Sequence, residues 1–391
     1  MAAMKIRRNA ATPKGFLRRV DDCGFEGVTD LRHASWVVHP LVGVLKLGAL
    51  ALATHARSTR AVETRSEQLR GAVRDALGLS ERVSDNAFGQ ILPSLDWLEL
   101  RRGLHRQVKA EARRGNLDPT HLSKSTVAID GKHLATIPEK RLRSLISQRT
   151  DLDGHALEPE ELRRVLRTQF PYVQLQHGDE GRLHGLVAAH RATLVSAAAA
   201  PTIDQWPLAG KTNEWGTIEL TVSMLLKAYG RTRLVERVTL DAGNATPDVA
   251  GQLDEREVDY FMTLNTSQGA LHQQARGLLE GRPGRQAQHR VVVDERGKMI
   301  CYTVWQAELD EEHGFDGARQ VFRIERVAAS EEDATVGTRF FVSSEAPEQL
   351  GAEEALKLAR AHWRCENEGH WTADAIFDED ARRTPWTQHP V

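Results

Sequence analysis

A short apolar run that ends in an aspartate is the feature that most constrains this chain. Thr126–Ile129 is apolar or β-branched throughout, Asp130 follows it directly, and Gly131 comes next. This pattern predicts a short buried strand that stops where a carboxylate faces a cleft. We therefore expect a β-sheet that carries an acidic side chain at the end of an interior strand.

The same design occurs a second time, where Leu234–Leu240 leads into Asp241. Two carboxylates brought together raise each other's pKa unless a cation neutralises them, so the repeat predicts a shared divalent cation. Such a site needs a third acid. Glu366 is the candidate, because it lies in the polar and aromatic run His362–Trp371 at the end of a helical pattern.

Other interpretations of this run stay open at this point. Glu368 and Asp380 are rival candidates for the third carboxylate. Four potential zinc ligands also recur at four-residue spacing on one helix face, namely His362, Glu366, His370 and Asp374. Ligands eight residues apart on a straight helix lie ~12 Å apart along its axis, which opposes tetrahedral zinc coordination from that helix alone.

Taken in order, three blocks resemble one known family. They are Ala128–Lys132, Val238–Ala242 and the His-Trp-x-x-Glu-Asn-x-x-His-Trp block at 362–371. The sequence resembles the H-repeat-associated insertion-sequence transposases, a DDE family with an RNase H-like core, from roughly residue 16 to 383. The resemblance implies that Asp130, Asp241 and Glu366 are both catalytic residues and metal ligands. It also implies Mg²⁺ as the cofactor, with Mn²⁺ as an alternative.

The implied fold is α/β, with an RNase H-like mixed sheet flanked by helices. We expect a helical N-terminal domain over residues 1–120 and a catalytic domain over 121–391. Within the catalytic domain, charge and Pro/Gly content predict a surface insert at about 138–185, outside the sheet. Strands are expected at 186–189 and 192–197 as an antiparallel pair, and a β-rich insertion at about 288–344 precedes the helix of the catalytic Glu.

The first 120 residues show helical patterns without a competing strand pattern. Leu41–Leu52 predicts a buried helix after Pro40, and Ser58 and Ser84 stand where helix N-caps are expected. Short helices with polar turns suit a helix-turn-helix module. A helical dimerisation cap is the alternative.

The formal net charge of −2 gives no global basic field, so any DNA-binding surface must be a local patch. The densest basic cluster precedes the first catalytic strand and contains Arg101, Arg102, Arg106 and Lys109. It predicts contact with phosphate backbone, with a solvated helix face as the alternative. Lys132, Arg364 and His370 are further candidates for DNA contact. The expected partner is double-stranded DNA, as transposon ends and as target.

The cysteines and the lengths of the apolar runs indicate in which cellular compartment the protein is expected. The three cysteines are far apart and lack zinc-ligand spacing, which predicts reduced thiols. The longest apolar run, near Leu47–Ala53, is too short to span a bilayer. We expect a cytoplasmic, nucleoid-associated protein without a membrane partner, acting as a homodimer on DNA.

The function predicted from these residues is that of a DDE transposase. It would hydrolyse DNA at insertion-sequence ends with Mg²⁺, and the freed 3′-hydroxyl would attack target DNA. Two alternatives are a domesticated or truncated transposase-derived nuclease and a non-catalytic DNA-binding or assembly protein. The intact set of three acids argues against the last.

Overall fold

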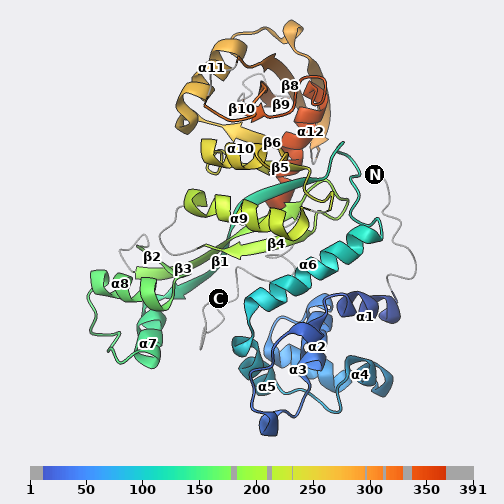
Figure 1. Cartoon of the computed structure of the whole chain (residues 1–391), viewed down its shortest axis with the longest axis vertical. Coiled ribbons are helices and arrows are strands. Elements are labelled where there is room, and N and C mark those ends of the chain that lie inside the picture. The colour runs from blue at the N-terminus through green and yellow to red at the C-terminus, as the bar shows by residue number, and fades with distance from the viewer. Residues whose placement is uncertain are drawn as a thin grey trace.

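The computed structural model describes residues 12–177, 183–208, 214–230, 232–295, 297–310, 314–328 and 337–366. A cluster of short helices forms one end of the molecule, a sheet with covering helices forms the middle, and a strand-rich part forms the other end (Figure 1). Helix α6 (Trp97–Arg113) runs between the helical cluster and the sheet (Figure 1).

The N-terminal part is helical, as expected. Its helices are α1 (Pro13–Asp21), α2 (Leu41–Ala53), α3 (Thr59–Gln68), α4 (Gly71–Leu77), α5 (Asp85–Ile91) and α6 (Trp97–Arg113). The side chains of Ser58 and Ser84 accept hydrogen bonds from the backbone N–H groups of Ala61 and Ala87, so both predicted N-caps are confirmed. Each cap satisfies a backbone donor that the first helical turn leaves unpaired.

The central strands are β1 (Thr126–Pro138), β3 (Leu183–Leu194), β4 (Thr202–Pro207), β5 (Arg237–Leu240) and β6 (Asp259–Leu264). Strand β1 pairs with β3 in antiparallel and with β5 in parallel orientation, and β5 pairs in parallel with β6. On the other side of β3 lies β4, again antiparallel. Parallel strands must be connected by long crossovers, and the segment between β4 and β5 supplies one through helix α9 (Glu214–Tyr229).

Helices cover both faces of this sheet. On one face lie α9 (Glu214–Tyr229), α10 (Pro247–Asp254) and α11 (Gly269–Leu279), which bury an apolar cluster against β1, β5 and β6. On the other face lies α12 (Ala352–His362), whose buried side chains form a second cluster with Ala128 and Phe261. Coverage of both faces explains why the short parallel strands β5 and β6 are buried along most of their length, including the polar Arg237 and Thr239 of β5.

The strand-rich segment continues the same sheet. Its strands are β7 (His289–Glu295), β8 (Lys298–Glu308), β9 (Gln320–Ala328) and β10 (Gly337–Ser343). Because β10 pairs with β6, the order across the sheet is β2-β3-β1-β5-β6-β10-β9-β8-β7, where β2 is Gln174–His177 and β4 also pairs with β3. The predicted strands at 288–344 are confirmed, and they extend the central sheet.

The prediction that the segment 138–185 lies outside the sheet is wrong. It contains α7 (Glu139–Arg149), α8 (Pro159–Gln169) and β2 (Gln174–His177), and β2 pairs with β3 at the sheet edge. The helices pack on the long ends of β1 and β3 around a separate apolar cluster that includes Ile137 and Leu162. The order of the other strands is unchanged, because β2 is added at the edge.

The prediction that residues 186–189 and 192–197 form two separate strands paired in antiparallel orientation is wrong. Residues 186–189 and 192–194 belong to the single strand β3, residues 195–197 lie in the turn after it, and the partner strand that follows is β4. His190 and Arg191 interrupt the apolar pattern, yet both are buried, His190 beside Thr221 of α9 and Arg191 as a donor to Gln205 of β4. The architecture is nonetheless a mixed sheet flanked by helices, consistent with an RNase H-like fold. No described helix is both long and apolar enough to cross a membrane.

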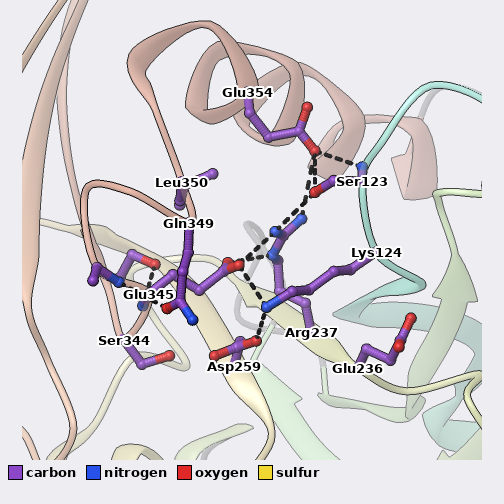
Figure 2. A network of polar contacts seen from close by, with 12 residues as sticks. Ser123, Lys124, Glu236, Arg237, Asp259, Ser344, Glu345, Gln349, Leu350 and Glu354 are labelled. Carbon is purple, nitrogen blue, oxygen red and sulfur yellow. Dashed lines mark hydrogen bonds and ion pairs between the residues drawn. The ribbon is translucent and has the colours of Figure 1, made fainter.

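A buried ion pair ties together the ends of the strands opposite to Asp130 and Asp241 (Figure 2). The Arg237 guanidinium donates to both carboxylate oxygens of Glu345, over 2.6 and 2.9 Å, and both side chains are 0% exposed. Lys124 approaches the same carboxylate at 2.8 Å, and Glu354 of α12 lies 3.8 Å from Arg237. The network therefore joins the entry to β1, strand β5, the loop after β10 and the start of α12.

Removal of one partner should cost far more than removal of both. Glu345→Leu leaves the Arg237 charge buried without its main counter-ion, so we expect it to lower the free energy of unfolding by about 3–5 kcal/mol. The double variant Arg237→Met/Glu345→Leu should recover a large part of that loss. Lys124→Met, at a more exposed position, is the matched control and should cost about 1 kcal/mol or less.

Urea unfolding of the four proteins measures these values. Equal destabilisation by Glu345→Leu and Lys124→Met would contradict a special role for the buried pair.

Acid should destabilise the protein through His190. Its Nδ1 lies 3.0 Å from Thr221 Oγ1, its Nε2 has no hydrogen-bond partner among the described residues, and burial lowers its pKa to about 4. The unfolded chain therefore binds the extra proton below pH ~6.5 while the folded chain stays neutral until about pH 4. Between pH 7 and 5, this histidine should remove about 2 kcal/mol of stability.

Urea unfolding at both pH values, compared with His190→Gln, tests this expectation. The variant should lose correspondingly less stability on acidification, and exposed His155→Gln should behave as the wild type. An identical loss in wild type and His190→Gln would contradict it.

Candidate active site

The register of β1 and β5 brings the two aspartates side by side. Ile129 is paired with Leu240 in the parallel ladder, and each is followed directly by the acidic residue, Asp130 or Asp241. Neighbouring strands lie about 4.8 Å apart, so the two Cα atoms occupy adjoining positions where the parallel pairing ends. The expectation that the first strand stops at Asp130 is wrong, because β1 continues to Pro138 through its antiparallel pairing with β3. The prediction that these residues lie on neighbouring strands of one mixed sheet is confirmed.

Strand alternation decides which face the two carboxylates share. Side chains two residues apart on a strand point to the same face, so Asp130 shares the face of Ala128, and Asp241 shares that of Thr239. Ala128 packs in the apolar cluster under α12, and Thr239 Oγ1 lies 3.0 Å from His362 Nδ1 on α12. Both aspartates therefore face the side of the sheet that α12 covers.

Glu366 arrives at this edge from the end of α12. The helix begins beside Arg237, reaches Thr239 with His362, and is interrupted by a turn at Trp363 before a further helical turn that carries Cys365 and Glu366. Cys365 Sγ lies 3.8 Å from Asp130 Oδ2 and donates a long hydrogen bond to it. The helix expected to carry the catalytic Glu is therefore present as far as Glu366, and the residues that follow lie beyond the described part of the chain.

Two neutral side chains hold the loop that carries Asp241. The backbone N–H and Nδ2 of Asn244 both donate to Asp241 Oδ1, each over 3.0 Å. The amide nitrogen of Gln268 donates to the carbonyls of Ala242 and Ala245, over 2.8 and 2.9 Å. These contacts fix the loop and occupy Oδ1 of Asp241, while Oδ2 accepts no hydrogen bond from the residues that the structure describes.

The electrostatics of the site show crowded negative charge. Burial, followed by repulsion from Asp241, raises the pKa of Glu366, and the positive charge of Arg339 opposes this shift. Burial and the nearby charges of Asp130 and Glu366 raise the pKa of the Cys365 thiol, so this group stays protonated. Burial lowers the pKa of His362 to about 4, which leaves a neutral imidazole beside Thr239.

The same features describe how a cation would fit. Within residues 12–366, as far as the structure describes them, no three or more His, Cys, Asp or Glu side chains are close enough together to hold one metal ion. Asp130 and Asp241 offer oxygen ligands, which Mg²⁺ and Mn²⁺ prefer. The pKa of Glu366 is raised, and a positive charge nearby would stabilise its ionised carboxylate form. The donor chemistry therefore suits a hard divalent cation.

The predicted DNA-binding residues on α6 are mostly engaged inside the protein. Arg101 forms a bidentate pair with Asp204, at 2.7 and 2.5 Å, and has a 9% exposed side chain, so its assignment to DNA is not kept. Arg106 donates to the backbone carbonyls of Cys23 and Gly24. Lys109 lies over the Tyr229 ring, and Arg102 is exposed.

The other candidates for DNA contact also need revision. The Arg364 guanidinium donates to the carbonyls of Val195, Ala197 and Ala198, so it anchors the end of α12 to the loop after β3. Lys132 is only 6% exposed, which does not suit a solvent-facing phosphate contact. His370 lies outside the described residues, as do the remaining members of the zinc and third-acid alternatives, Glu368, Asp374 and Asp380.

Sequence reasoning missed three residues that shape the site. Asn244 and Gln268 act through loop geometry that no periodicity reveals, although Gln268 follows Asn265 in a segment of polar side chains typical of a capping turn. Arg339 lies on β10, far from Glu366 in sequence, and only the pairing of β10 with β6 brings it near. The three cysteines are free thiols, as expected.

Comparisons with known proteins relate the chain distantly to transposases. No protein-family model matches it. It is similar to a protein of Escherichia coli O157:H7 described as "Putative transposase YncI", with 24% identity over 219 residues. The match covers 52% of this chain and 53% of that protein, so the chain spans about half the length of the relative that it matches.

The charge coupling between Glu366 and Asp241 can be tested without any activity. Asp241→Asn removes the neighbouring negative charge, so we expect the pKa of Glu366 to fall towards its ordinary value. Carbon-13 NMR titration of labelled glutamate carboxyls measures it, with Glu366→Gln to assign the signal. The remote change Asp294→Asn is the control and should leave the titration unchanged. An unaltered Glu366 titration in Asp241→Asn would contradict the proximity of the two acids.

Proposed function

We propose that this chain is a DDE transposase with an RNase H-like catalytic core. It would cleave DNA at the ends of an insertion sequence and transfer the freed strand into target DNA. The observation that carries the proposal is the register that places Asp130, inside β1, beside Asp241, which directly follows β5, with both facing the helix that leads to Glu366. The distant similarity to a protein described as a transposase supports the same class.

The proposed roles follow from the geometry. Asp130, Asp241 and Glu366 would hold Mg²⁺ or Mn²⁺ at the sheet edge. When bound, such ions lower the pKa of water and neutralise charge on the leaving oxygen. Asn244 occupies Asp241 Oδ1, which would leave Oδ2 as the ligand atom. Cys365 would orient Asp130 through its thiol hydrogen.

In the first step, water would attack the scissile phosphorus and the P–O3′ bond would break, which leaves a 3′-hydroxyl and a 5′-phosphate. In the second step, that hydroxyl would attack a phosphodiester of the target, so one phosphodiester bond forms as another breaks. The proposed partner is double-stranded DNA, and a homodimer on DNA in the nucleoid belongs to the same proposal. Of the α6 cluster, exposed Arg102 remains a candidate for backbone contact.

A second candidate function is DNA binding without catalysis. It is favoured by one observation, that among the side chains placed by the structure no three potential ligands converge on a single ion position. A domesticated or truncated nuclease is intermediate between the two, because it would cleave DNA without strand transfer. Cleavage and strand-transfer assays separate all three.

Cleavage should require a divalent cation and all three acids. The full chain is incubated with DNA that carries the inverted repeats flanking its own coding region, with and without Mg²⁺. Asp130→Asn, Asp241→Asn and Glu366→Gln should each reduce nicking by more than about 100-fold, because even residues that only support metal ligands contribute about 10–100-fold. The exposed Glu160→Gln is the control and should cleave as the wild type.

A further variant, Glu368→Ala, separates the rival third acids and should have little effect. Robust cleavage by Glu366→Gln would remove that residue from the site. Metal-independent nicking, or full activity in all three acid variants, would contradict the proposed mechanism.

A further inference from the structure

An arginine stacked on an exposed tryptophan stands beside the candidate active site. The Arg339 guanidinium carbon on β10 lies 4.4 Å from the centre of the Trp363 ring, directly after α12. Trp363 is 36% exposed, and Arg339 is exposed as well. Core packing alone would explain a fully buried tryptophan. The Trp363 ring, however, is partly exposed to solvent and has a cationic side chain on its face.

The charge of Arg339 differs from those of its neighbours, because no acidic side chain of the described residues pairs with it. Arg326 and Arg360 both approach Glu295, at 3.0 and 3.3 Å, and Arg323 approaches Glu325 at 3.1 Å. Within the described ranges, no Asp or Glu oxygen lies within 4.0 Å of an Arg339 nitrogen. Its donors are therefore available to a ligand.

Position relates this cation to the three acids. Trp363 precedes Glu366 by three residues, and its ring centre is 6.3 Å from that of His362, which bonds to Thr239 two residues before Asp241. The stacked pair consequently lies at the rim of the carboxylate edge, on the side that α12 and β10 supply.

The chemistry of the pair indicates what it would bind. A guanidinium presents a planar fork of N–H donors that matches two phosphate oxygens, and stacking on an aromatic face restricts its motion before a ligand arrives. Clustered carboxylates repel a phosphodiester chain, so a free cation at their rim would offset that repulsion where a strand enters. A surface cation–π contact without a ligand is the alternative explanation.

We propose that Arg339, held by Trp363, binds a backbone phosphate of the DNA strand whose neighbouring phosphodiester faces Asp130, Asp241 and Glu366. This inference rests on the proposed function for the identity of the strand. It adds a phosphate-binding residue from β10, which neither the sequence motifs nor the similarity to transposases assigns.

Salt dependence of DNA binding tests the contact without cleavage. A labelled duplex that carries the flanking inverted repeat is titrated with the full chain in EDTA, at salt concentrations from about 50 to 200 mM. Each phosphate neutralised by a protein cation contributes about 0.9 to the slope of log affinity against log salt. Arg339→Ala should therefore flatten the slope by about 0.9, with an affinity loss of several-fold at low salt.

Two further variants distinguish bidentate phosphate binding by the guanidinium from a general effect of positive charge. Arg339→Lys should retain the slope but bind more weakly, because it keeps the charge and loses the fork. Arg233→Ala, an exposed arginine near the opposite end of the sheet, is the matched control and should leave the slope unchanged. Circular dichroism melting of each variant confirms that the fold is retained, since neither Arg339 nor Arg233 is buried.

The outcomes distinguish this inference from the proposed function. An unchanged slope in Arg339→Ala overturns the phosphate contact, and metal-dependent cleavage by the wild type would still support the transposase proposal. A flattened slope without any cleavage by the wild type would support the contact and overturn the catalytic proposal. Absence of DNA binding by the wild type would overturn both.

Discussion

The buried pair between Arg237 and Glu345 is the constraint on which the site depends. Two fully buried charges carry a large desolvation cost, which is offset only when their partners are held in place. Here that requirement joins β5 to the loop after β10 and to the start of α12, at the end of the sheet opposite to the acids. Because α12 is a rigid rod that begins at this network, its far end is directed to the edge where Asp130 and Asp241 lie.

The parts of the fold that follow local patterns could be predicted from the sequence. Apolar runs that end in Asp130 and Asp241 identified the two parallel strands, and alternating residues identified the strands from 288 to 344. Tertiary contacts decided the rest. Arg101 resembles a solvent-facing residue in sequence, but Asp204, 103 residues away, neutralises it. The strand β3 contains His190 and Arg191, whose burial depends on partners from α9 and β4.

The sequence predicted the acidic residues of the candidate site, but it did not reveal the residues that support them. Charge is visible in a sequence, whereas Asn244 bonds to Asp241 only in the folded turn after β5, and Gln268 bonds only once the segment after β6 meets that turn. Arg339 reaches the acids because β10 adds to β6, a pairing across more than 70 residues of sequence. The resulting edge combines oxygen ligands with one free cation among the described residues near them, which suits a metal ion and a phosphodiester together.

The most direct measurement of the central claim is the position of a bound divalent cation. Crystals of the full chain grown or soaked with Mn²⁺ would be measured at a wavelength where manganese scatters anomalously. The account predicts an anomalous peak coordinated by carboxylate oxygens of Asp130 and Asp241, with Glu366 directed to it, and loss of that peak in Asp241→Asn. Saturating Mn²⁺ that leaves these carboxylates without a peak, or binds only at a different cluster, would contradict it.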